Sequence, residues 1–142
     1  MSHHIERTLI IVKPDAVAAG HTGKIIDRFL AEGFRLVAMK MICLSEAGAR
    51  AFYYVHDGKP FFADLVDFMS SGPIVPMVFE APNAINRARE ILGATDPQEA
   101  APGTLRQLFA VSKGHNAVHG SDAPATAAFE IGFYFSKLEQ VG

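Results

Sequence analysis

A short run of β-branched and other large apolar residues near the N-terminus constrains this chain most strongly. Thr8 to Val12 reads TLIIV, and a continuous apolar run of this length is typical of a strand buried on both faces. Lys13-Pro14-Asp15 ends the run, because proline has no N–H and restricts the residue before it. The fold must therefore cover both faces of this strand. Lys13, at its exit, is either a solvated strand end or a functional group.

Strand-like and helix-like segments alternate through the rest of the chain. Apolar residues at helical spacing predict helices over 24–32, 45–56, 61–69, 83–92, 104–109 and 123–130. Strands are predicted over 34–44, 74–80 and 131–135, and 94–103 is a polar loop without periodicity. This order favours an α/β (α+β) fold: a ferredoxin-like βαββαβ sheet, antiparallel or mixed, with helices on its faces and an inserted loop before His119.

The composition is that of one globular domain. With 142 residues, 49% of them apolar and 20% charged, we expect a single domain spanning residues 1–142. No apolar run is long enough to span a bilayer, and residues 1–7 lack a signal-peptide pattern, so we expect no membrane association. The net charge of −2 argues against a dedicated nucleic-acid-binding protein. Cys43 is the only cysteine, which fits a reducing compartment, and we expect a cytoplasmic protein.

The segment from Asn116 to Asp122 reads NAVHGSD and is rich in chemically useful side chains. A histidine held among amide, hydroxyl and carboxylate groups can act as a general base, a metal ligand or a nucleophile. The alternative is a turn that happens to contain His119. Gly120 is expected to interrupt any strand or helix that runs through the segment.

Basic residues elsewhere suggest an anion site. Lys13 leaves the buried strand, Arg89 lies on the helix before the long loop, and Arg106 follows that loop. If the loop folds back, these cations and the hydroxyls of Thr95 and Thr104 could converge near His119, and arginine suits bidentate phosphate contacts. The alternative is that both arginines lie on solvated helix faces.

Two other site patterns fit poorly. The segment Gly20-His21-Thr22-Gly23-Lys24 is not a P-loop, because only two residues separate its glycines and Ile25 follows the lysine. His115 and His119 have a zinc-ligand spacing if they are helical, but glycines flank them and no further Cys or His cluster completes a site.

Six segments together resemble the nucleoside diphosphate kinase family in order and spacing, over about residues 5–135. They are Glu6-Arg7-Thr8-Leu9 continuing to Val12-Lys13-Pro14-Asp15-Ala16-Val17, then Lys59-Pro60-Phe61-Phe62, Ser71-Gly72-Pro73, Leu92-Gly93-Ala94-Thr95, Pro102-Gly103-Thr104-Leu105-Arg106 and the segment 116–122. The KPDAV and N-x-x-H-G-S-D motifs are specific.

The resemblance implies a phosphohistidine enzyme that moves the γ-phosphate of a nucleoside triphosphate to a nucleoside diphosphate by a ping-pong mechanism. By match to the motifs, His119 is the phosphorylated residue, Glu130 orients it, and Tyr53 lies near the transferred phosphate. The resemblance also implies Mg²⁺ bound mainly through the phosphates with Asp122 nearby, and a homo-oligomer, tetramer or hexamer. The remaining matched residues would bind the nucleotide: Lys13, Arg89, Thr95 and Arg106 through phosphates, Asn116 through the ribose and phosphates, and Phe61 through the base.

The chemistry of these residue types agrees with that implication. A histidine nucleophile attacks through a neutral nitrogen, and a carboxylate on the other ring nitrogen sets its tautomer and aim. Phosphoryl transfer needs mostly positioning and charge stabilisation, which lysine, arginine and Mg²⁺ supply. An aromatic ring stacks on any base, so broad base tolerance is expected.

A few positions depart from the family's common pattern. His115 stands where many members have arginine, Ala123 replaces a frequent serine, Phe129 replaces a charged residue, and Pro76 interrupts a strand that lies inside the family's sheet. A proline there normally marks an edge or a bulge. Two alternatives stay open: a catalytically silent nucleotide-binding scaffold on the same fold, and an RNA-binding ferredoxin-like module, which the charge and the missing aromatic motif disfavour.

Overall fold

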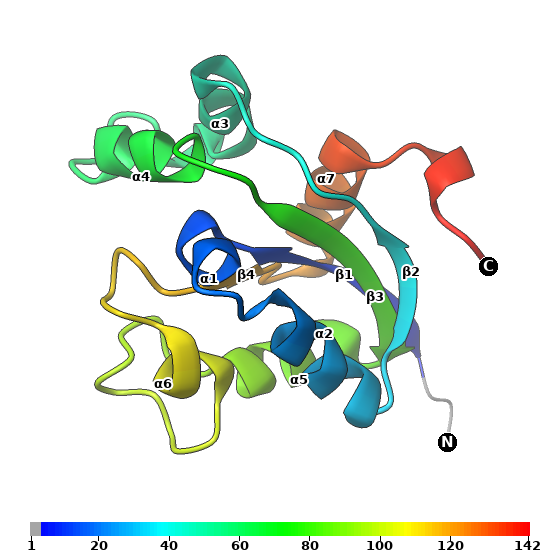
Figure 1. Ribbon diagram of the computed structural model, residues 1–142. Coiled ribbons are helices and arrows are strands. Elements are labelled where there is room, and N and C mark those ends of the chain that lie inside the picture. Colours follow the sequence, from blue (N-terminus) through cyan, green and yellow to red (C-terminus); the bar gives the residue numbers. More distant parts are fainter. Residues whose placement is uncertain (1–3) are drawn as a thin grey trace.

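The computed structural model describes residues 4–142 as one four-stranded antiparallel sheet covered by helices (Figure 1). The strand order is β2-β3-β1-β4, with β1 at Ile5–Val12, β2 at Arg35–Met39, β3 at Val75–Pro82 and β4 at Val118–Gly120. Helices connect β1 to β2 and β3 to β4, which confirms the predicted ferredoxin-like βαββαβ fold. The expectation of no signal peptide falls partly on residues 1–3, which lie outside the described part of the chain.

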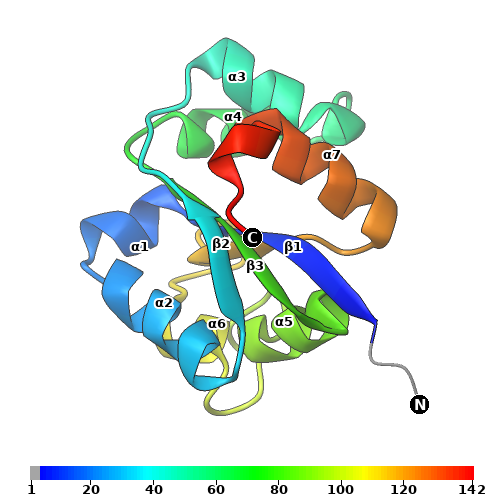
Figure 2. The ribbon, with the colours of Figure 1, turned by 90° about the vertical axis from the view of Figure 1, so that its right-hand side faces the viewer.

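The helices form a layer on each face of the sheet (Figures 1 and 2). One layer holds α1 (Pro14–Ala18), α2 (Thr22–Ala31), α5 (Ala84–Leu92) and α6 (Leu105–Phe109). The other holds α3 (Glu46–Phe52), α4 (Phe62–Met69) and α7 (Pro124–Tyr134), and 3₁₀-helices occupy Tyr54–His56 and Lys137–Glu139. No helix among residues 4–142 has both the length and the apolar character needed to cross a membrane.

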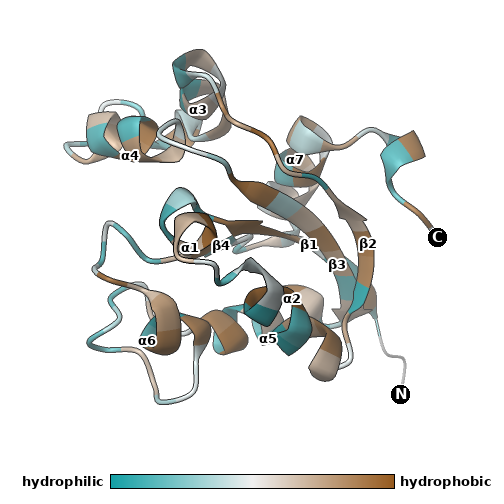
Figure 3. Cartoon of the chain, in the orientation of Figure 1, coloured by the Kyte–Doolittle hydropathy of each residue, from teal (hydrophilic) through white to brown (hydrophobic). Residues whose placement is uncertain are grey.

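Strand β1 supplies both hydrophobic cores, as its apolar run predicts. Ile10 and Val12 pack with α2 and α5, whereas Leu9 and Ile11 pack with α3, α4 and α7, because alternate side chains of a strand point to opposite faces. All four side chains are fully buried. The hydrophobic colouring accordingly runs along the central strands and the inner helix faces (Figure 3). Burial on both sides fixes β1, and hence the position of Lys13 at its end.

Pro76 lies within β3, a central strand of the sheet, although a proline in a strand normally marks an edge or a bulge. It pairs with Ile11 on β1, and its carbonyl accepts the N–H of Lys40 at 3.2 Å. In an antiparallel pair the N and O of one residue point to the same side, so the nitrogen of Pro76 also faces β2. Strand β2 ends at Met39, one residue before Lys40. The N–H donor that Pro76 lacks would therefore lie at the end of β2, where that strand leaves the sheet.

The structure corrects the predictions around His119. The sequence predicted no strand here, whereas Val118–Gly120 forms β4 against Ile10–Val12 of β1. The strand ends at Gly120, as expected of this glycine. A Cβ at Gly120 would lie 2.6 Å from Leu92, so glycine lets β4 pack closely on α5. The predicted strand 131–135 is also wrong: α7 continues to Tyr134, because Ile131, Tyr134 and Phe135 reach the core at helical spacing.

Other boundaries shift by smaller amounts. The predicted strand 34–44 is shorter, since β2 ends at Met39 and only Ile42 pairs again, with Ile74. The predicted helix 45–56 divides into α3 and a 3₁₀-turn after Phe52, and Ser45 caps α3 by accepting the N–H of Gly48 at 3.0 Å.

Candidate active site

One cleft of about 1220 Å³ opens between α4, α7 and the segment that joins α6 to β4. Its walls come from parts of the chain that are far apart in sequence, from the end of β1 to α7. Ten of the side chains singled out above line this single cleft: Lys13, Tyr53, Phe61, Arg89, Thr95, Arg106, Asn116, His119, Asp122 and Glu130. Thr104 does not, and its predicted place in the site is wrong: it is the buried N-cap of α6, where its hydroxyl donates to the carbonyl of Ala101 at 2.8 Å. The fold thus brings the predicted residues together.

His119 lies on β4, directly across from Ile11 of β1. Its Nε2 is 2.8 Å from Oε1 of Glu130 on α7, and a carboxylate can only accept, so Nε2 carries the proton and Nδ1 keeps its lone pair. The rings of Phe52 and Tyr53 stand edge-on to the imidazole, with centroids 5.6 and 6.2 Å away. Packing and the carboxylate together fix the ring.

Glu130 is itself held in place by Ser121. The Ser121 hydroxyl donates to Oε1 of Glu130 at 2.7 Å and accepts the N–H of Leu9 at 3.2 Å. Ser121 is fully buried, so this chain of bonds ties the carboxylate to the backbone of β1. A carboxylate oriented in this way keeps the imidazole in one tautomer.

Lys13 is buried beside the segment that precedes β4. Its Nζ donates to Oδ1 of Asn116 at 2.7 Å. Burial and the nearby charge of Arg106 lower the pKa of Lys13 to about 8, and the carboxylate of Asp15 raises it in opposition. A cation with so little solvent around it is a strong attractor for an anion that enters the cleft.

Arg106 on α6 bridges two parts of the site. Its guanidinium donates to the carbonyl of Gly93 at 3.0 Å and to the carbonyl of Val118 at 2.9 Å. Burial, followed by the charge of Arg89, lowers the pKa of Arg106 to about 10. Arg89 and Thr95 are exposed on the cleft wall, so neither arginine is only a solvated helix face. With Lys113, the cleft is lined by four cationic side chains, of which Lys13 and Arg106 are the most deeply buried.

Two aromatic side chains mark different depths of the cleft. Tyr53 is buried, its hydroxyl has no partner among the described residues, and burial raises its pKa well above the usual value. Phe61, before α4, is 48% exposed and lies against His56, with ring centroids 5.2 Å apart. A half-exposed phenylalanine at the mouth can stack on a planar ligand, whereas Tyr53 is close to His119.

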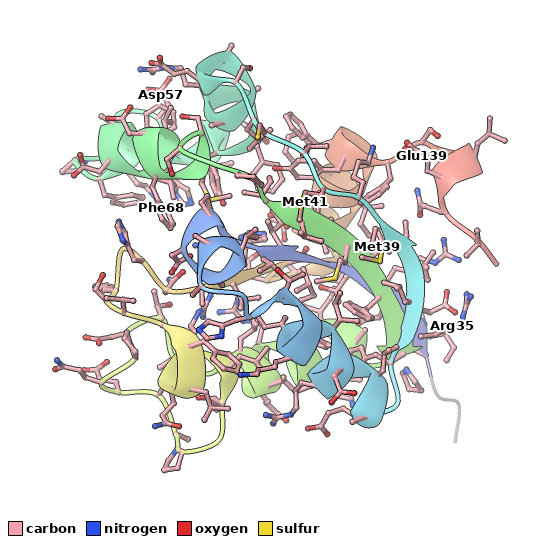
Figure 4. All side chains as sticks on the ribbon, in the orientation of Figure 1. Arg35, Met39, Met41, Asp57, Phe68 and Glu139 are labelled. Carbon is pink, nitrogen blue, oxygen red and sulfur yellow. The ribbon has the colours of Figure 1, made fainter. Side chains whose placement is uncertain are left out.

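His115 belongs to the mouth of the cleft and not to a metal site. Its ring stacks on Phe68 with centroids 4.3 Å apart and an interplanar angle of 10°. Phe68 lies on the side of α4 that faces this segment (Figure 4). His119 is instead paired with Glu130, and residues 4–142 contain no group of three His, Cys, Asp or Glu side chains suited to a metal ion.

A sequence model described as Nucleoside diphosphate kinase matches residues 6–140. The chain belongs to the nucleoside diphosphate kinase family. Membership places it among enzymes that transfer phosphoryl groups between nucleotides, and disfavours both a silent scaffold and an RNA-binding module.

Individual members of the nucleoside diphosphate kinase family agree over nearly the whole chain. The nucleoside diphosphate kinase of Syntrophotalea carbinolica is 61% identical over 135 residues, which cover 95% of this chain and 98% of that protein. A crystal structure of the Aquifex aeolicus enzyme superposes with a TM-score of 0.96 at 54% identity, covering 97% of this chain and 100% of that one. The Halobacterium salinarum enzyme in complex with CDP gives a TM-score of 0.95 at 41% identity, covering 98% and 93%.

The donors in the cleft fit the Mg²⁺ that the nucleoside diphosphate kinase family implies. Asp122 is an exposed carboxylate on the cleft wall, and its Oδ1 accepts the hydroxyl of Thr126 at 2.7 Å. Mg²⁺ keeps several waters and usually binds one or two carboxylates together with substrate phosphates. Glu130 is bonded to His119, so Asp122 is a cleft carboxylate left to face a metal that arrives with the phosphates.

Sequence reasoning assigned no role to Ser121 or Asp15, although both lie inside the family motifs. Ser121 bonds Glu130, and Asp15 accepts the N–H of Ala117 at 3.1 Å, two residues before His119. Their position within KPDAV and N-x-x-H-G-S-D was the available signal. Which atoms they contact depends on the pairing of β1 with β4.

Proposed function

We propose that this chain transfers the γ-phosphate of a nucleoside triphosphate to a nucleoside diphosphate through a phosphohistidine at His119. The observation that carries the proposal is the Nε2–Glu130 hydrogen bond in a cleft lined by Lys13, Arg89 and Arg106. The bond leaves Nδ1 as the nucleophilic atom, and the cations supply the charge that a triphosphate requires.

In the proposed first step, Nδ1 of His119 attacks the γ-phosphorus. An N–P bond forms, the bond from the γ-phosphorus to the bridging oxygen breaks, and the diphosphate leaves with that oxygen and its electron pair. Lys13 and Arg106 stabilise the charge on the equatorial and leaving oxygens, and the Tyr53 hydroxyl lies close to the transferred group. A different diphosphate then reverses the step, so one pocket serves donor and acceptor in turn.

The remaining cleft residues would hold the nucleotide. Phe61 stacks on the base through its exposed face, Asn116 bonds the ribose and phosphates, and Arg89 and Thr95 bind the phosphate chain. The Halobacterium salinarum relative has been solved in complex with CDP, which supports nucleotide binding by this chain. Because a π-face does not distinguish bases, we expect broad base tolerance.

Mg²⁺ is the proposed cofactor. When bound, it would neutralise part of the phosphate charge, and the carboxylate of Asp122 on the cleft wall would hold it together with the phosphates. We further propose that residues 1–142 act as one catalytic domain. A cytoplasmic location is proposed on the single cysteine, Cys43, which suits a reducing compartment.

We also propose a homo-oligomer, a tetramer or a hexamer. Strand β2 is at the edge of the sheet, and Met39 and Met41 beside it are 47% and 61% exposed (Figure 4). The C-terminal segment bonds this edge at one point, where the N–H of Val141 donates to the carbonyl of Val37 at 3.0 Å. The exposed methionines beside it offer an apolar surface for self-association. Native mass spectrometry would give the number of subunits, and a monomer at micromolar concentration would contradict this part of the proposal.

The test of the function is intact mass spectrometry after brief incubation with ATP and Mg²⁺, without acid. We expect a gain of one phosphate, about 80 Da, that is lost on adding GDP and absent in His119→Ala. His115→Ala is the matched control, because it removes another histidine of the same cleft and should keep the adduct. Nucleotide binding without any adduct in the unsubstituted chain would refute the proposal and favour a silent scaffold.

A further inference from the structure

Ala117 has a backbone conformation that alanine rarely adopts. Its φ is 72°, and among residues 4–142 only Asn83 is another non-glycine residue with positive φ. Ala117 is fully buried and lies directly before β4, two residues from His119. A positive φ is unfavourable for alanine, because its Cβ crowds the backbone, so the surrounding structure must hold it there.

The turn from β1 into α1 holds the segment before His119 through three hydrogen bonds. Oδ2 of Asp15 accepts the N–H of Ala117 at 3.1 Å, and the carbonyl of Ala117 accepts the N–H of Lys13 at 2.9 Å. Nζ of Lys13 holds the side chain of Asn116 at 2.7 Å. The other oxygen of Asp15, Oδ1, is buried and has no hydrogen-bond partner among the described residues. A carboxylate would rarely be kept in such a place without a function.

We propose that Asp15 is a positioning residue for phosphoryl transfer, whose carboxylate locks Ala117 in the left-handed conformation and so aims Asn116 and His119 into the cleft. This inference rests on the proposed function of His119. Asp15 is not among the residues that line the cleft. It acts through the backbone that leads into β4.

The charge of Asp15 has a second effect, on the protonation of Lys13. Lys13 faces the cation of Arg106, the carboxylate of Asp15 and the neutral amide of Asn116. Asp15 opposes the influence of burial and of Arg106, so it helps Lys13 to remain protonated. Removal of the charge should therefore lower the pH at which Lys13 loses its proton.

A purely structural reading predicts something different. Asp15 is in the first turn of α1, where an acidic residue favours the helix dipole. On that reading its loss would lower thermal stability, but folded molecules would phosphorylate His119 at the normal rate and with an unchanged pH profile.

The experiment compares Asp15→Ala and Asp15→Asn with the control Asp27→Ala. Asp27 is exposed on α2 and makes no side-chain hydrogen bond within residues 4–142. Rapid-quench measurement gives the rate of His119 phosphorylation per folded molecule between pH 6 and pH 10. Hydrogen exchange measured by NMR reports on the Ala117 amide independently of activity.

We expect Asp15→Ala to slow phosphorylation about 10- to 100-fold, because a misplaced nucleophile loses much of its effective concentration. Its Ala117 amide should exchange at least about tenfold faster, since the amide loses its acceptor. Asp15→Asn keeps an acceptor oxygen and should retain more activity, with an alkaline loss of activity at lower pH than in the unsubstituted chain. Asp27→Ala should match the unsubstituted chain in all three readouts.

Normal phosphorylation by folded Asp15→Ala, or an alkaline limb that Asp15→Asn does not move, would overturn the proposal. Unchanged exchange of the Ala117 amide in Asp15→Ala would also overturn it. An unsubstituted chain that forms no phosphohistidine would refute the proposed function, and with it the catalytic part of this inference. The exchange measurement would then still decide whether Asp15 locks Ala117.

Discussion

Oε1 of Glu130 accepts two hydrogen bonds at once, one from Nε2 of His119 at 2.8 Å and one from the hydroxyl of Ser121 at 2.7 Å. The imidazole is thus attached through one nitrogen to α7, while its strand is attached to β1. The other nitrogen is left for chemistry. Nε2 is held by Glu130 and Nδ1 is available to react, and the first two predictions concern the groups that hold Nε2.

Glu130→Gln should slow formation of the phosphohistidine about 10- to 100-fold, the range typical of groups that orient a functional histidine. The amide is nearly the same size but carries no charge to hold the Nε2 proton. Stopped-flow or rapid-quench rates with ATP give the measurement. Nucleotide affinity, measured by calorimetry, should change little, and a normal phosphorylation rate would contradict the role of Glu130.

Ser121→Ala should affect stability more than Glu130→Gln does. It removes one donor to Glu130, and it also leaves the buried N–H of Leu9 without its acceptor. An unsatisfied buried N–H costs about 1–3 kcal/mol, which urea unfolding would detect. The phosphorylation rate should fall less than in Glu130→Gln, because the His119–Glu130 bond itself remains. An equal or larger loss of rate would contradict this ranking.

The pH dependence of kcat/KM should reflect Lys13. Its pKa in the free enzyme is lowered to about 8 by burial and by Arg106. Activity should therefore fall as the pH rises through about 8, since the neutral amine no longer attracts phosphate. Lys13→Arg, which stays charged, should lose this alkaline limb even if its overall activity is lower. A flat profile from pH 7 to pH 9.5 in the unsubstituted chain would contradict the prediction.

The titration of Lys13 should also affect folding stability, which should rise with pH where activity falls. The unfolded chain holds the Lys13 proton up to about pH 10.5, whereas the folded chain releases it near pH 8. Between these values the unfolded state binds more protons, so the contribution of Lys13 to the free energy of unfolding rises with pH. Urea unfolding at pH 7.5 and 9.5 tests this, with Lys13→Met as the reference that lacks the titration. The unsubstituted chain should gain stability relative to Lys13→Met.

Gly93→Ala should damage the phosphate side of the cleft. Gly93 has φ +85°, and a Cβ there would collide with the side chain of Thr104. The carbonyl of Gly93 also accepts a hydrogen bond from the guanidinium of Arg106. We expect a loss of about 2–4 kcal/mol, from backbone strain together with overpacking, and a higher KM for nucleotides. Gly103→Ala is the matched control, because φ is +86° and a Cβ would meet nothing within 4 Å. Equal effects in the two variants would contradict the role of the Thr104 contact.

The elements that could be predicted are those with a long, regular pattern. Helices α2, α4 and α5 and strands β1 and β3 have enough apolar residues at one period to identify them. The residues 131–135 were harder, because an apolar run of five residues fits a strand or the end of a helix. These residues form the end of α7, because Ile131 and Tyr134 pack in the core at helical spacing. Strand β4 has only three residues, too few for any periodicity, and exists because β1 pairs with it.

By itself the sequence determined the family, the βαββαβ succession of elements and ten of the side chains that line the cleft, since these follow from local pattern and from motifs. The tertiary structure alone decided which atoms meet: that Ser121 bonds Glu130, that Asp15 holds Ala117, and that Pro76 can stand in a central strand. Each depends on packing between separate elements: Ser121, after β4, meets Glu130 on α7, Asp15 on α1 meets the segment before β4, and Pro76 on β3 pairs with Ile11 on β1. A motif specifies which side chains occur and how far apart they are along the chain. The distances between their atoms are set only when the strands pair and the helices pack on the sheet.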